Sequence, residues 1–476
     1  MKSKLLIVFA LLNSHTFSQI KKIERPDYKY ISTIQIDHII KKLMDTAEVT
    51  GLQIGIINNN KISYLKSYGY KNKSKDQLND TATIFYAASL SKPLFAYLVM
   101  MLKDEKKIDL DKPLYQYLPK PLSEYENYKD LAGDDRWKLI TARNCLDHTT
   151  GFPNWRQFNP HDNQKLEIFF TPGSRYAYSG EGITLLQMVI EIITGRGLEE
   201  LCREKIFAPF GMNRTSFIWQ SSFENNYAIG YDMNGDPLQK NKRTKAYAAG
   251  SMETTIGDYS RFIMGVMSGR GISESTKQDM VTKQIEIKTI RQFPSLNNDS
   301  TISNKKIDLS YGLGWGLFLT PYGNAFFKEG HDDGWVHYMI SVPGKKYAII
   351  FLCNSSNGES IYKELVEKLA GIDIPYIWEN YIPYRATIKL SEEYLKQFTG
   401  EYDGKMKAKI SLNNGKLKAE SSTTGLPPTN LYATNDHHFF LKIMDVELEF
   451  IKGNNGKIEK LLVNDEGDTF ELKKIK

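Results

Sequence analysis

Hydrophobic residues follow two different periods in the first part of the chain. Between positions 36 and 47 the apolar residues recur at helical spacing, and Gly51 follows where a helix C-cap would lie. Two largely apolar runs come next, 52–57 and 62–68, and three asparagines at 58–60 separate them. The pattern predicts an amphipathic helix followed by a β-hairpin.

The strand pattern returns late in the chain. Residues from about 89 to 267 are mostly of helical pattern, interrupted by loops that contain Pro and Gly. Strand-like runs follow at 311–319, 325–328, 335–342 and 347–353. We expect these late strands to complete the sheet that the N-terminal hairpin begins. The prediction is an α/β domain: an antiparallel sheet flanked by helices, plus a helical lobe.

The C-terminal part has a different pattern. Residues 375–390 contain several prolines and aromatics, which predicts a linker. Beyond them, short alternating segments flank the turn sequences Asn413-Asn414-Gly415 and Asn455-Gly456. We therefore predict a main domain over 19–374, a linker over 375–390, and a small antiparallel β-barrel of lipocalin-like type over 391–476.

The first eighteen residues have the order of a secretory signal. Lys2 and Lys4 precede an apolar stretch from Leu5 to Leu12, and a polar segment ends at the small residue Ser18. About eight apolar residues are too few to span a bilayer, so a membrane anchor is the weaker interpretation. We expect cleavage after residue 18 and a periplasmic or secreted protein with no transmembrane segment.

Charge and cysteine content exclude further classes of function. Loss of Lys2 and Lys4 with the signal lowers the net charge from +6 to +4, and the lysines alternate with acidic residues, so nucleic acid is not an expected partner. The three cysteines lie in apolar stretches, which predicts buried free thiols. His437 and His438 are adjacent rather than three or four apart, so we predict no metal, and no cofactor.

One short motif has the chemistry of a nucleophile. Ser89 precedes a helix with apolar periodicity, and Lys92 follows three residues later, so both side chains lie on one helix face. The lysine can activate the serine hydroxyl, and the helix N-terminus favours a developing oxyanion. The alternative is that Ser89 is an ordinary N-cap and Lys92 a surface lysine. Ser-x-x-Lys alone leaves both interpretations open.

Further segments resemble the serine β-lactamase and penicillin-binding-protein superfamily, in particular its class C, esterase and D-aminopeptidase-like branch. The resemblance covers most of the chain, and its six segments follow the order of the family. They are Ser89-Leu90-Ser91-Lys92, the LDHTTG loop at 146–151, PGSRYAYS at 172–179, AGSM at 249–252, YGLGW at 311–315, and Gly330-His331.

The resemblance implies a transpeptidase-like fold and an acyl-enzyme mechanism on a small-molecule or peptide substrate. Ser89 would attack a carbonyl, while Lys92 and Tyr178 would share the proton-accepting role. The backbone N–H groups of Ser89 and Gly334 would hold the oxyanion. A tyrosine phenol titrates near 10, so Tyr178 can be a base only if Lys92 lowers its pKa. His148 is expected to support a loop rather than to complete a triad.

One departure from the family pattern lies beside the tyrosine. The family has Asn two residues after it, whereas this chain has Gly180. The amide that would orient the substrate and the lysine is therefore missing. Ser179 or Glu181 is expected to take its place.

A second departure concerns charge. The segment that corresponds to Lys-Thr-Gly of the β-lactamases is His331, Asp332 and Asp333, which we expect to contact the substrate. A carboxylate about 5 Å from an uncompensated Asp meets a repulsion of very roughly 3 kcal/mol at an effective dielectric near 20. The sequence therefore predicts poor hydrolysis of penicillins and cephalosporins, and better turnover of neutral esters or of substrates with a free amine.

Three activities remain open on these grounds. The favoured one is an exported serine hydrolase that acts on an ester or amide without the usual β-lactam carboxylate. The second is a D,D-peptidase or β-lactamase that acts on cell-wall peptides or β-lactams. The third is a catalytically weak relative that binds peptidoglycan or peptide, which Gly180 and Asp333 would favour.

Overall fold

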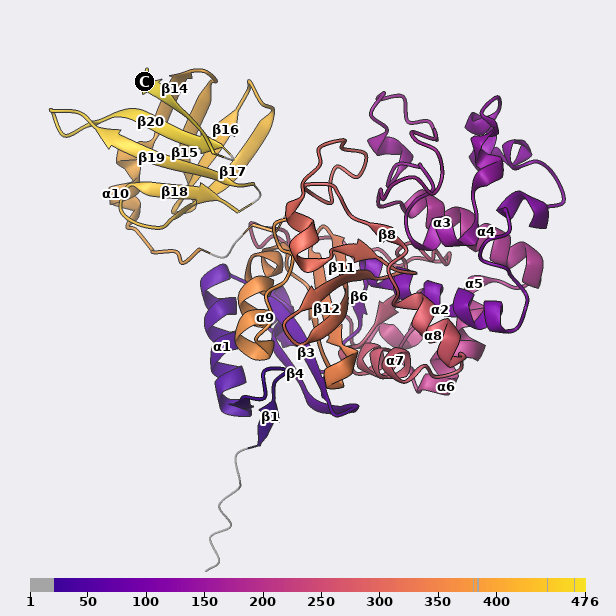
Figure 1. Cartoon of the computed structure of the whole chain (residues 1–476). Coiled ribbons are helices and arrows are strands. Elements are labelled where there is room, and N and C mark those ends of the chain that lie inside the picture. Colours follow the sequence, from indigo (N-terminus) through magenta and orange to yellow (C-terminus); the bar gives the residue numbers. More distant parts are fainter. Residues whose placement is uncertain (1–20, 380, 383–384, 443, 466) are drawn as a thin grey trace, which may run out of the picture.

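The structure is a computed structural model that describes residues 21–379, 381–382, 385–442, 444–465 and 467–476. It consists of a large α/β body and a small β-barrel (Figure 1). The predicted secretory signal, residues 1–18, lies outside the described residues. Within the described ranges, no helix is long and apolar enough to cross a membrane.

A nine-stranded antiparallel sheet forms the centre of the α/β body, in the order β5-β4-β3-β13-β12-β11-β10-β9-β8. Its strands, from one edge to the other, are β5 (Gln77–Leu78), β4 (Lys61–Asn72), β3 (Gly51–Asn58), β13 (Tyr347–Cys353), β12 (Trp335–Val342), β11 (Gly323–Asp332), β10 (Gly316–Thr320), β9 (Ser310–Tyr311) and β8 (Ile285–Glu286). Two short pairs lie outside it: β1 (Lys22–Glu24) with β2 (Tyr30–Ser32), and β6 (Phe85–Tyr86) with β7 (Glu253–Thr254).

The early and late strands share one sheet, as predicted. β3 of the N-terminal hairpin pairs with β13 from Asn58 opposite Tyr347 to Leu52 opposite Cys353. The strand predicted at 311–319 is wrong in part, because the chain leaves the sheet between β9 and β10. Gly314 approaches α2 so closely there that a Cβ would lie 2.5 Å from the Ala96 side chain.

Helices cover both faces of the sheet (Figure 1). On one face α1 and α9 pack together, and the opposite face packs against α2, α7 and the helical lobe. The α-helices are α1 (Thr33–Ala47), α2 (Ser91–Asp104), α3 (Ala142–Leu146), α4 (Gly180–Thr194), α5 (Leu198–Cys202), α6 (Ala208–Phe210), α7 (Ile256–Ser268), α8 (Glu274–Met280), α9 (Tyr362–Ala370) and α10 (Glu392–Leu395).

The first helix ends earlier than the sequence indicated. Glu48, not Gly51, adopts the left-handed conformation that ends α1, with φ of 56°. Gly51 instead begins β3, where a Cβ would lie 2.4 Å from the carbonyl oxygen of Tyr70. The glycine is required there by the close approach of two strands.

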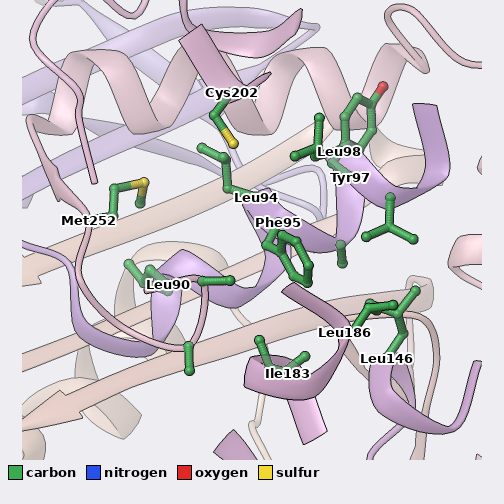
Figure 2. Close-up of a cluster of buried hydrophobic side chains, with 14 of the residues drawn as sticks. Leu90, Leu94, Phe95, Tyr97, Leu98, Leu146, Ile183, Leu186, Cys202 and Met252 are labelled. Atoms are coloured by element: carbon green, nitrogen blue, oxygen red, sulfur yellow. The ribbon is translucent and has the colours of Figure 1, made fainter. Parts of the chain in front are cut away.

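α2 is buried along almost its whole length. Every residue from Ser91 to Leu102 is buried, as is typical of a helix that is apolar on all faces. Figure 2 shows Leu94, Phe95 and Leu98 packed among side chains of α3, α4 and α5, including Cys202. The three cysteines are buried and unpaired, as predicted. This packing fixes the helix at whose N-terminus Ser89 lies.

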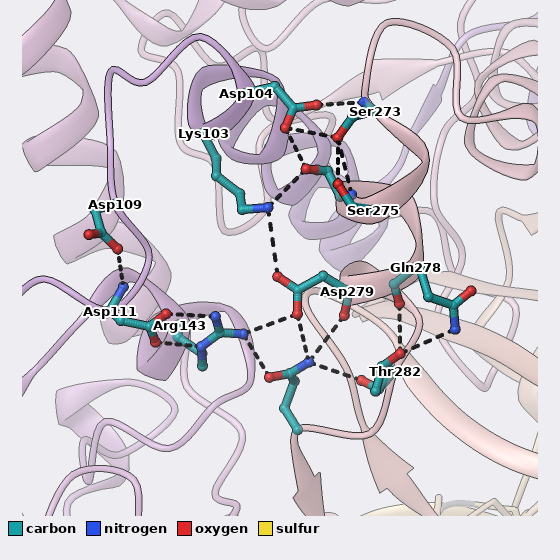
Figure 3. A network of polar contacts seen from close by, with 12 residues as sticks. Lys103, Asp104, Asp109, Asp111, Arg143, Ser273, Ser275, Gln278, Asp279 and Thr282 are labelled. Carbon is teal, nitrogen blue, oxygen red and sulfur yellow. Dashed lines mark hydrogen bonds and ion pairs between the residues drawn. The ribbon is translucent and has the colours of Figure 1, made fainter.

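Polar contacts fix the other end of α2 (Figure 3). Asp104, its last residue, accepts a hydrogen bond from the Ser273 N–H, 2.5 Å away, at the start of α8. Arg143 of α3 donates to Asp111 at 2.6 Å and to Asp279 of α8 at 3.3 Å. The helix is therefore held at both ends and cannot slide relative to the lobe.

The C-terminal part is a closed eight-stranded barrel with its own apolar core. Its strands are β14 (Gly400–Gly404), β15 (Ala408–Asn413), β16 (Lys416–Ser421), β17 (Leu426–Ala433), β18 (His438–Leu441), β19 (Val446–Lys452), β20 (Ile458–Asp465) and β21 (Asp468–Lys474). Lys442 of the barrel donates to the Ala47 carbonyl oxygen at 3.2 Å, and the Tyr432 hydroxyl donates to the Met233 carbonyl oxygen at 3.1 Å. These bonds join the barrel to the α/β body.

Replacement of Leu98 by Ala is expected to lower the free energy of unfolding by about 2–5 kcal/mol, because it leaves a cavity among closely packed side chains. Urea unfolding followed by circular dichroism measures the change. Leu319→Ala is the matched control, since Leu319 is 49% exposed on β10. Equal losses for the two variants would contradict the assignment of α2 as the centre of the core.

Candidate active site

Ser89 lies in a strained turn that leads into α2. A short 3-10 turn, Ala88–Leu90, joins β6 to the helix, and Ala88 has φ of 46°. The left-handed region is costly for a residue other than glycine, so the surrounding contacts must hold this turn in place. The turn exposes Ser89 to a cleft on the surface of the α/β body.

His337 of β12 fastens the segment before Ser89 to the central sheet. Its Nδ1 accepts a hydrogen bond from the Cys353 N–H at 3.1 Å, so its Nε2 bears the proton and donates to the Tyr86 carbonyl oxygen at 2.7 Å. Burial lowers the pKa of His337 to about 4, which keeps the ring neutral. The position of the nucleophile turn is thus set by the sheet.

The amine of Lys92 lies next to the Ser89 hydroxyl. Lys92 Nζ is 3.0 Å from Ser89 Oγ and donates to the Ala249 carbonyl oxygen at 2.6 Å. The side chain is 1% exposed, and no ion pair joins it to a carboxylate of the described residues. Burial lowers the pKa of Lys92, although Tyr178 acts in the opposite direction. At a given pH, a larger fraction of Lys92 is therefore neutral than of a lysine in water.

Tyr178 lies between two lysines. The centroid of its ring is 5.0 Å from Lys92 Nζ and 4.7 Å from Lys328 Nζ, and its buried hydroxyl forms no hydrogen bond of ordinary geometry. Burial raises the pKa of Tyr178 and outweighs the effect of Lys92, which lowers it. The lowered pKa that a tyrosine base requires is therefore not found, because desolvation exceeds the charge effect.

The indole of Trp155 occupies the space next to Gly180. A Cβ on Gly180 would lie 2.5 Å from the six-membered ring of Trp155. The indole lines the cleft, and its ring is 5.8 Å from Lys92 Nζ. A residue larger than glycine does not fit at position 180, because the indole of Trp155 occupies the space that its side chain would need.

Neither residue expected to replace the missing amide lies in the cleft. Ser179 Oγ donates to the Pro153 carbonyl oxygen at 2.8 Å and accepts from the Gly182 N–H at 3.0 Å, which caps α4. Glu181 binds Arg156 through two hydrogen bonds of 2.9 Å. Both side chains hold the loop that bears Trp155, so this expectation does not agree with the geometry.

His148 supports the tyrosine rather than the serine. Its Nδ1 accepts from the Ser179 N–H at 3.2 Å, and its ring packs 4.4 Å from the ring of Tyr178. Burial lowers the pKa of His148 well below its ordinary range, so the ring is neutral. A structural role for His148, as expected from the sequence, agrees with these contacts.

The residues at the β11–β12 turn reach the cleft. His331, Asp332 and Asp333 all line it. Asp332 pairs with Arg243 at 3.8 Å, and the His331 ring lies 3.6 Å from Glu359. Desolvation opposes a charge on His331, but Glu359 and the two aspartates raise its pKa to about 9. His331 is thus cationic at neutral pH, and the turn is less negative than the sequence indicated.

Gly334 does not fit the role of an oxyanion donor. Its N–H donates to Ser356 Oγ at 2.8 Å, and φ of 77° places the residue in a turn conformation suited to glycine. The amide is therefore already engaged.

The cleft around Ser89 has a volume of about 1830 Å³. Its walls include Trp155 from the lobe, Tyr178 at the start of α4, Glu329 of β11, the loop 291–298, residues 376–382 as far as they are described, and Lys442 of the barrel. The sheet, the lobe and the barrel all contribute to it. Among the described residues, a set spaced to hold a metal lies elsewhere, at His437, His438 and Glu449, none of which lines the cleft.

Comparison with known proteins identifies the family. The model of the family described as "Beta-lactamase" matches residues 36–371, which is most of the chain. The chain belongs to the Beta-lactamase family. It is 24% identical to "Penicillin-binding protein 4*" of Bacillus subtilis over 85% of this chain and 90% of that protein, and 23% identical to "Protein flp" of Staphylococcus aureus over 76% and 70%.

Solved structures share the fold of the α/β body, and the likeness to one of them extends over most of the chain. The octameric penicillin-binding protein homologue from Pyrococcus abyssi is 20% identical, with a TM-score of 0.60 over 93% of this chain and all of that one. The D-alanine carboxypeptidase AmpC from Burkholderia cenocepacia is 20% identical, with a TM-score of 0.55 over 72% of this chain and 97% of that one. The predicted fold class is confirmed.

Lys328 was not among the site residues predicted from the sequence of this Beta-lactamase family member. Lys328 and Gly330 point to the same face of β11, and a Cβ on Gly330 would lie 2.9 Å from the Ala87 carbonyl oxygen, next to the nucleophile turn. Lys328-Glu329-Gly330 thus forms a Lys-x-Gly segment three residues before His331-Asp332-Asp333, the segment that was matched to Lys-Thr-Gly. This Lys-x-Gly pattern was the signal in the sequence. Trp155 was also missed, since a lone tryptophan in a loop has no distinctive pattern.

Replacement of Gly180 by Ala is expected to lower the free energy of unfolding by about 1–3 kcal/mol, because the added methyl group overlaps the Trp155 ring. Urea unfolding measures the loss. Gly344→Ala is the control, since no atom lies within 4 Å of the Cβ position there. In a Trp155→Ala background the Gly180→Ala change should cost much less, and an unchanged cost would show that the two residues do not share this space.

Proposed function

We propose that the protein is an exported serine hydrolase that acts on an ester or amide through an acyl-enzyme intermediate. The observation that supports it best is the distance of 3.0 Å between Ser89 Oγ and the amine of a buried Lys92. A serine needs a base within hydrogen-bond distance to act as a nucleophile at neutral pH. A lysine deprived of water and of a carboxylate partner is suited to that role.

In this mechanism Lys92 is the base and Tyr178 passes the proton on. The neutral amine accepts the proton of the Ser89 hydroxyl as Oγ forms a bond to the substrate carbonyl carbon. The Tyr178 phenol, which burial keeps protonated, lies beside the amine and can give its proton to the leaving group while it takes one from the Lys92 ammonium. The alcohol or amine then departs, and water releases the acyl group from Ser89.

The oxyanion site is proposed to use the backbone N–H groups of Ser89 and His331. Asp332 pairs with Trp335 across a two-residue turn, which makes that pair hydrogen-bonded. In an antiparallel ladder, hydrogen-bonded pairs alternate with pairs that are not hydrogen-bonded, so the next pair, His331–Val336, is not hydrogen-bonded. The N–H of His331 therefore points away from β12. β10 ends its pairing with β11 at Phe327, so this edge of β11 is open to the cleft. A carbonyl oxygen between Ser89 and His331 can meet two N–H groups there.

The charge distribution favours a substrate without a carboxylate at this edge. Lys328 is a cation in the site, and alone it would favour the second candidate, a D,D-peptidase or β-lactamase. Its ammonium is bound to Glu329 at 2.5 Å, however, which neutralises it. We therefore keep the ester or amide hydrolase as the proposed function.

Ser89→Ala should abolish covalent labelling by a fluorophosphonate, because it removes the atom that forms the bond. Intact-mass spectrometry should show one adduct on the unmodified protein and none on the variant. Ser91→Ala is the matched control, since the Ser91 hydroxyl donates within the core to the Ala88 carbonyl oxygen at 2.7 Å. An adduct that persists in Ser89→Ala would place the nucleophile elsewhere.

The rate of acylation should rise with pH through an apparent pKa below the ordinary value of a lysine, since burial lowers the pKa of Lys92 and only the neutral amine accepts a proton. Lys92→Ala should reduce kcat/KM on a p-nitrophenyl ester by about three powers of ten or more. Tyr178→Phe should retain the rising limb with a lower plateau. If Lys92→Ala kept near-full turnover, the base would have to be another group.

A further inference from the structure

One carboxyl group in the cleft is buried and only partly satisfied. Glu379 is 3% exposed and lies among the residues that line the cleft. Its Oε1 accepts a hydrogen bond from the Tyr338 hydroxyl at 2.8 Å, whereas its Oε2 has no hydrogen-bond partner among the described residues. A buried carboxyl oxygen without a donor is destabilising, which indicates a site completed by something else.

Other acceptors lie around the same part of the cleft. The Tyr381 hydroxyl is buried without a hydrogen-bond partner, and its ring packs 6.1 Å from that of Tyr338. Glu329, opposite Tyr338 in the β11–β12 register, accepts from Gln292 Nε2 at 2.7 Å and is also in the cleft wall. Two carboxyl groups and a phenol oxygen thus lie near one another, a set suited to a ligand that donates several hydrogen bonds.

This acidic set lies close to the proposed chemistry. Glu329 follows Lys328 on β11, and Lys328 Nζ is 4.7 Å from the ring of Tyr178. Lys328 is already bound to Glu329, and Arg291 also lines the cleft. Ser89, Glu329 and Glu379 therefore line one and the same cleft.

We propose that Glu379, together with Glu329 and the Tyr381 hydroxyl, forms a subsite for a primary ammonium group of the substrate. The inference rests on the proposed hydrolase function and narrows its substrate class to esters or amides that carry a free amine. An ammonium offers three N–H donors and a positive charge, which suit the unpaired oxygens of Glu379 and Tyr381 with Glu329 beside them. A neutral or acylated amine offers fewer donors and no positive charge.

The protonation state of Glu379 agrees with such a subsite. Burial raises the pKa of Glu379 well above its ordinary range, and the nearby Glu329 adds to the effect. The carboxyl group of Glu379 therefore binds a proton more readily than that of an ordinary glutamate, and the charge of an incoming ammonium would favour the loss of that proton.

The test measures how small molecules protect Ser89 from a fluorophosphonate. Alaninamide, as the L and D isomers, is compared with N-acetylalaninamide, which differs by the loss of the ammonium. Alaninamide is expected to protect at roughly 10- to 100-fold lower concentration, the ratio that one charge-assisted hydrogen bond supports. Nα-acetyl-lysinamide, with its amine on the side chain, shows which position of the amine the subsite accepts.

Glu379→Gln should raise the concentration of alaninamide needed for half-protection by roughly 10- to 100-fold and leave that of N-acetylalaninamide unchanged. Tyr381→Phe, which removes one hydroxyl, should show a smaller change of the same kind. Glu364→Gln is the matched control, because Glu364 Oε2 also lacks a partner but the residue does not line the cleft.

Equal protection by the two amides, or a Glu379→Gln variant with unchanged preference, would overturn the ammonium subsite while labelling of Ser89 still supported the hydrolase. Absence of labelling would instead count against the proposed function. Titration calorimetry of alaninamide with the unmodified protein and with Glu379→Gln then decides the subsite alone, since weaker binding to the variant supports it and equal binding refutes it.

Discussion

The burial of Lys92 is the constraint on which the rest of the site depends. An ammonium kept from water is costly unless a carboxylate accompanies it, and Lys92 instead has Ser89 Oγ and the Ala249 carbonyl oxygen as partners. Burial therefore lowers the pKa of Lys92. Such an environment exists because α2 is packed on every face and is fixed at its far end by Asp104. The reactivity of the serine is thus a property of the whole core.

Lys92 and Lys328 lie on either side of Tyr178 and differ in whether a carboxylate accompanies them. Lys328 is as buried as Lys92, but it is bound to Glu329 and so can keep its charge. Lys92 faces the indole of Trp155 and the ring of Tyr178, which offer an amine much weaker stabilisation than a carboxylate does. Burial lowers the pKa of both lysines, but for Lys328 the hydrogen bond to Glu329 acts against this effect.

The sequence was sufficient for elements that depend on local periodicity and for residues within one motif. The β3–β4 hairpin follows from its asparagine turn. Ser89 and Lys92 are neighbours because side chains three residues apart lie on the same face of a helix. Trp155 could not be inferred, since only tertiary packing brings a loop residue within contact of Gly180. The direction of the pKa shift of Tyr178 could not be inferred either, because desolvation depends on every atom around the ring and not on the nearest charge alone.

The attachment of the barrel has a consequence for access. Lys442 lies in the cleft wall and also bonds to the last turn of α1, so the position of the barrel relative to the α/β body limits the width of the opening. Because both bodies contribute walls to the cleft, a shift of the barrel relative to the α/β body would change the width of the opening, and with it the size of the molecule that can reach the serine. Selection by shape would then precede selection by chemistry, and it would reside in a part of the molecule that takes no part in bond breaking.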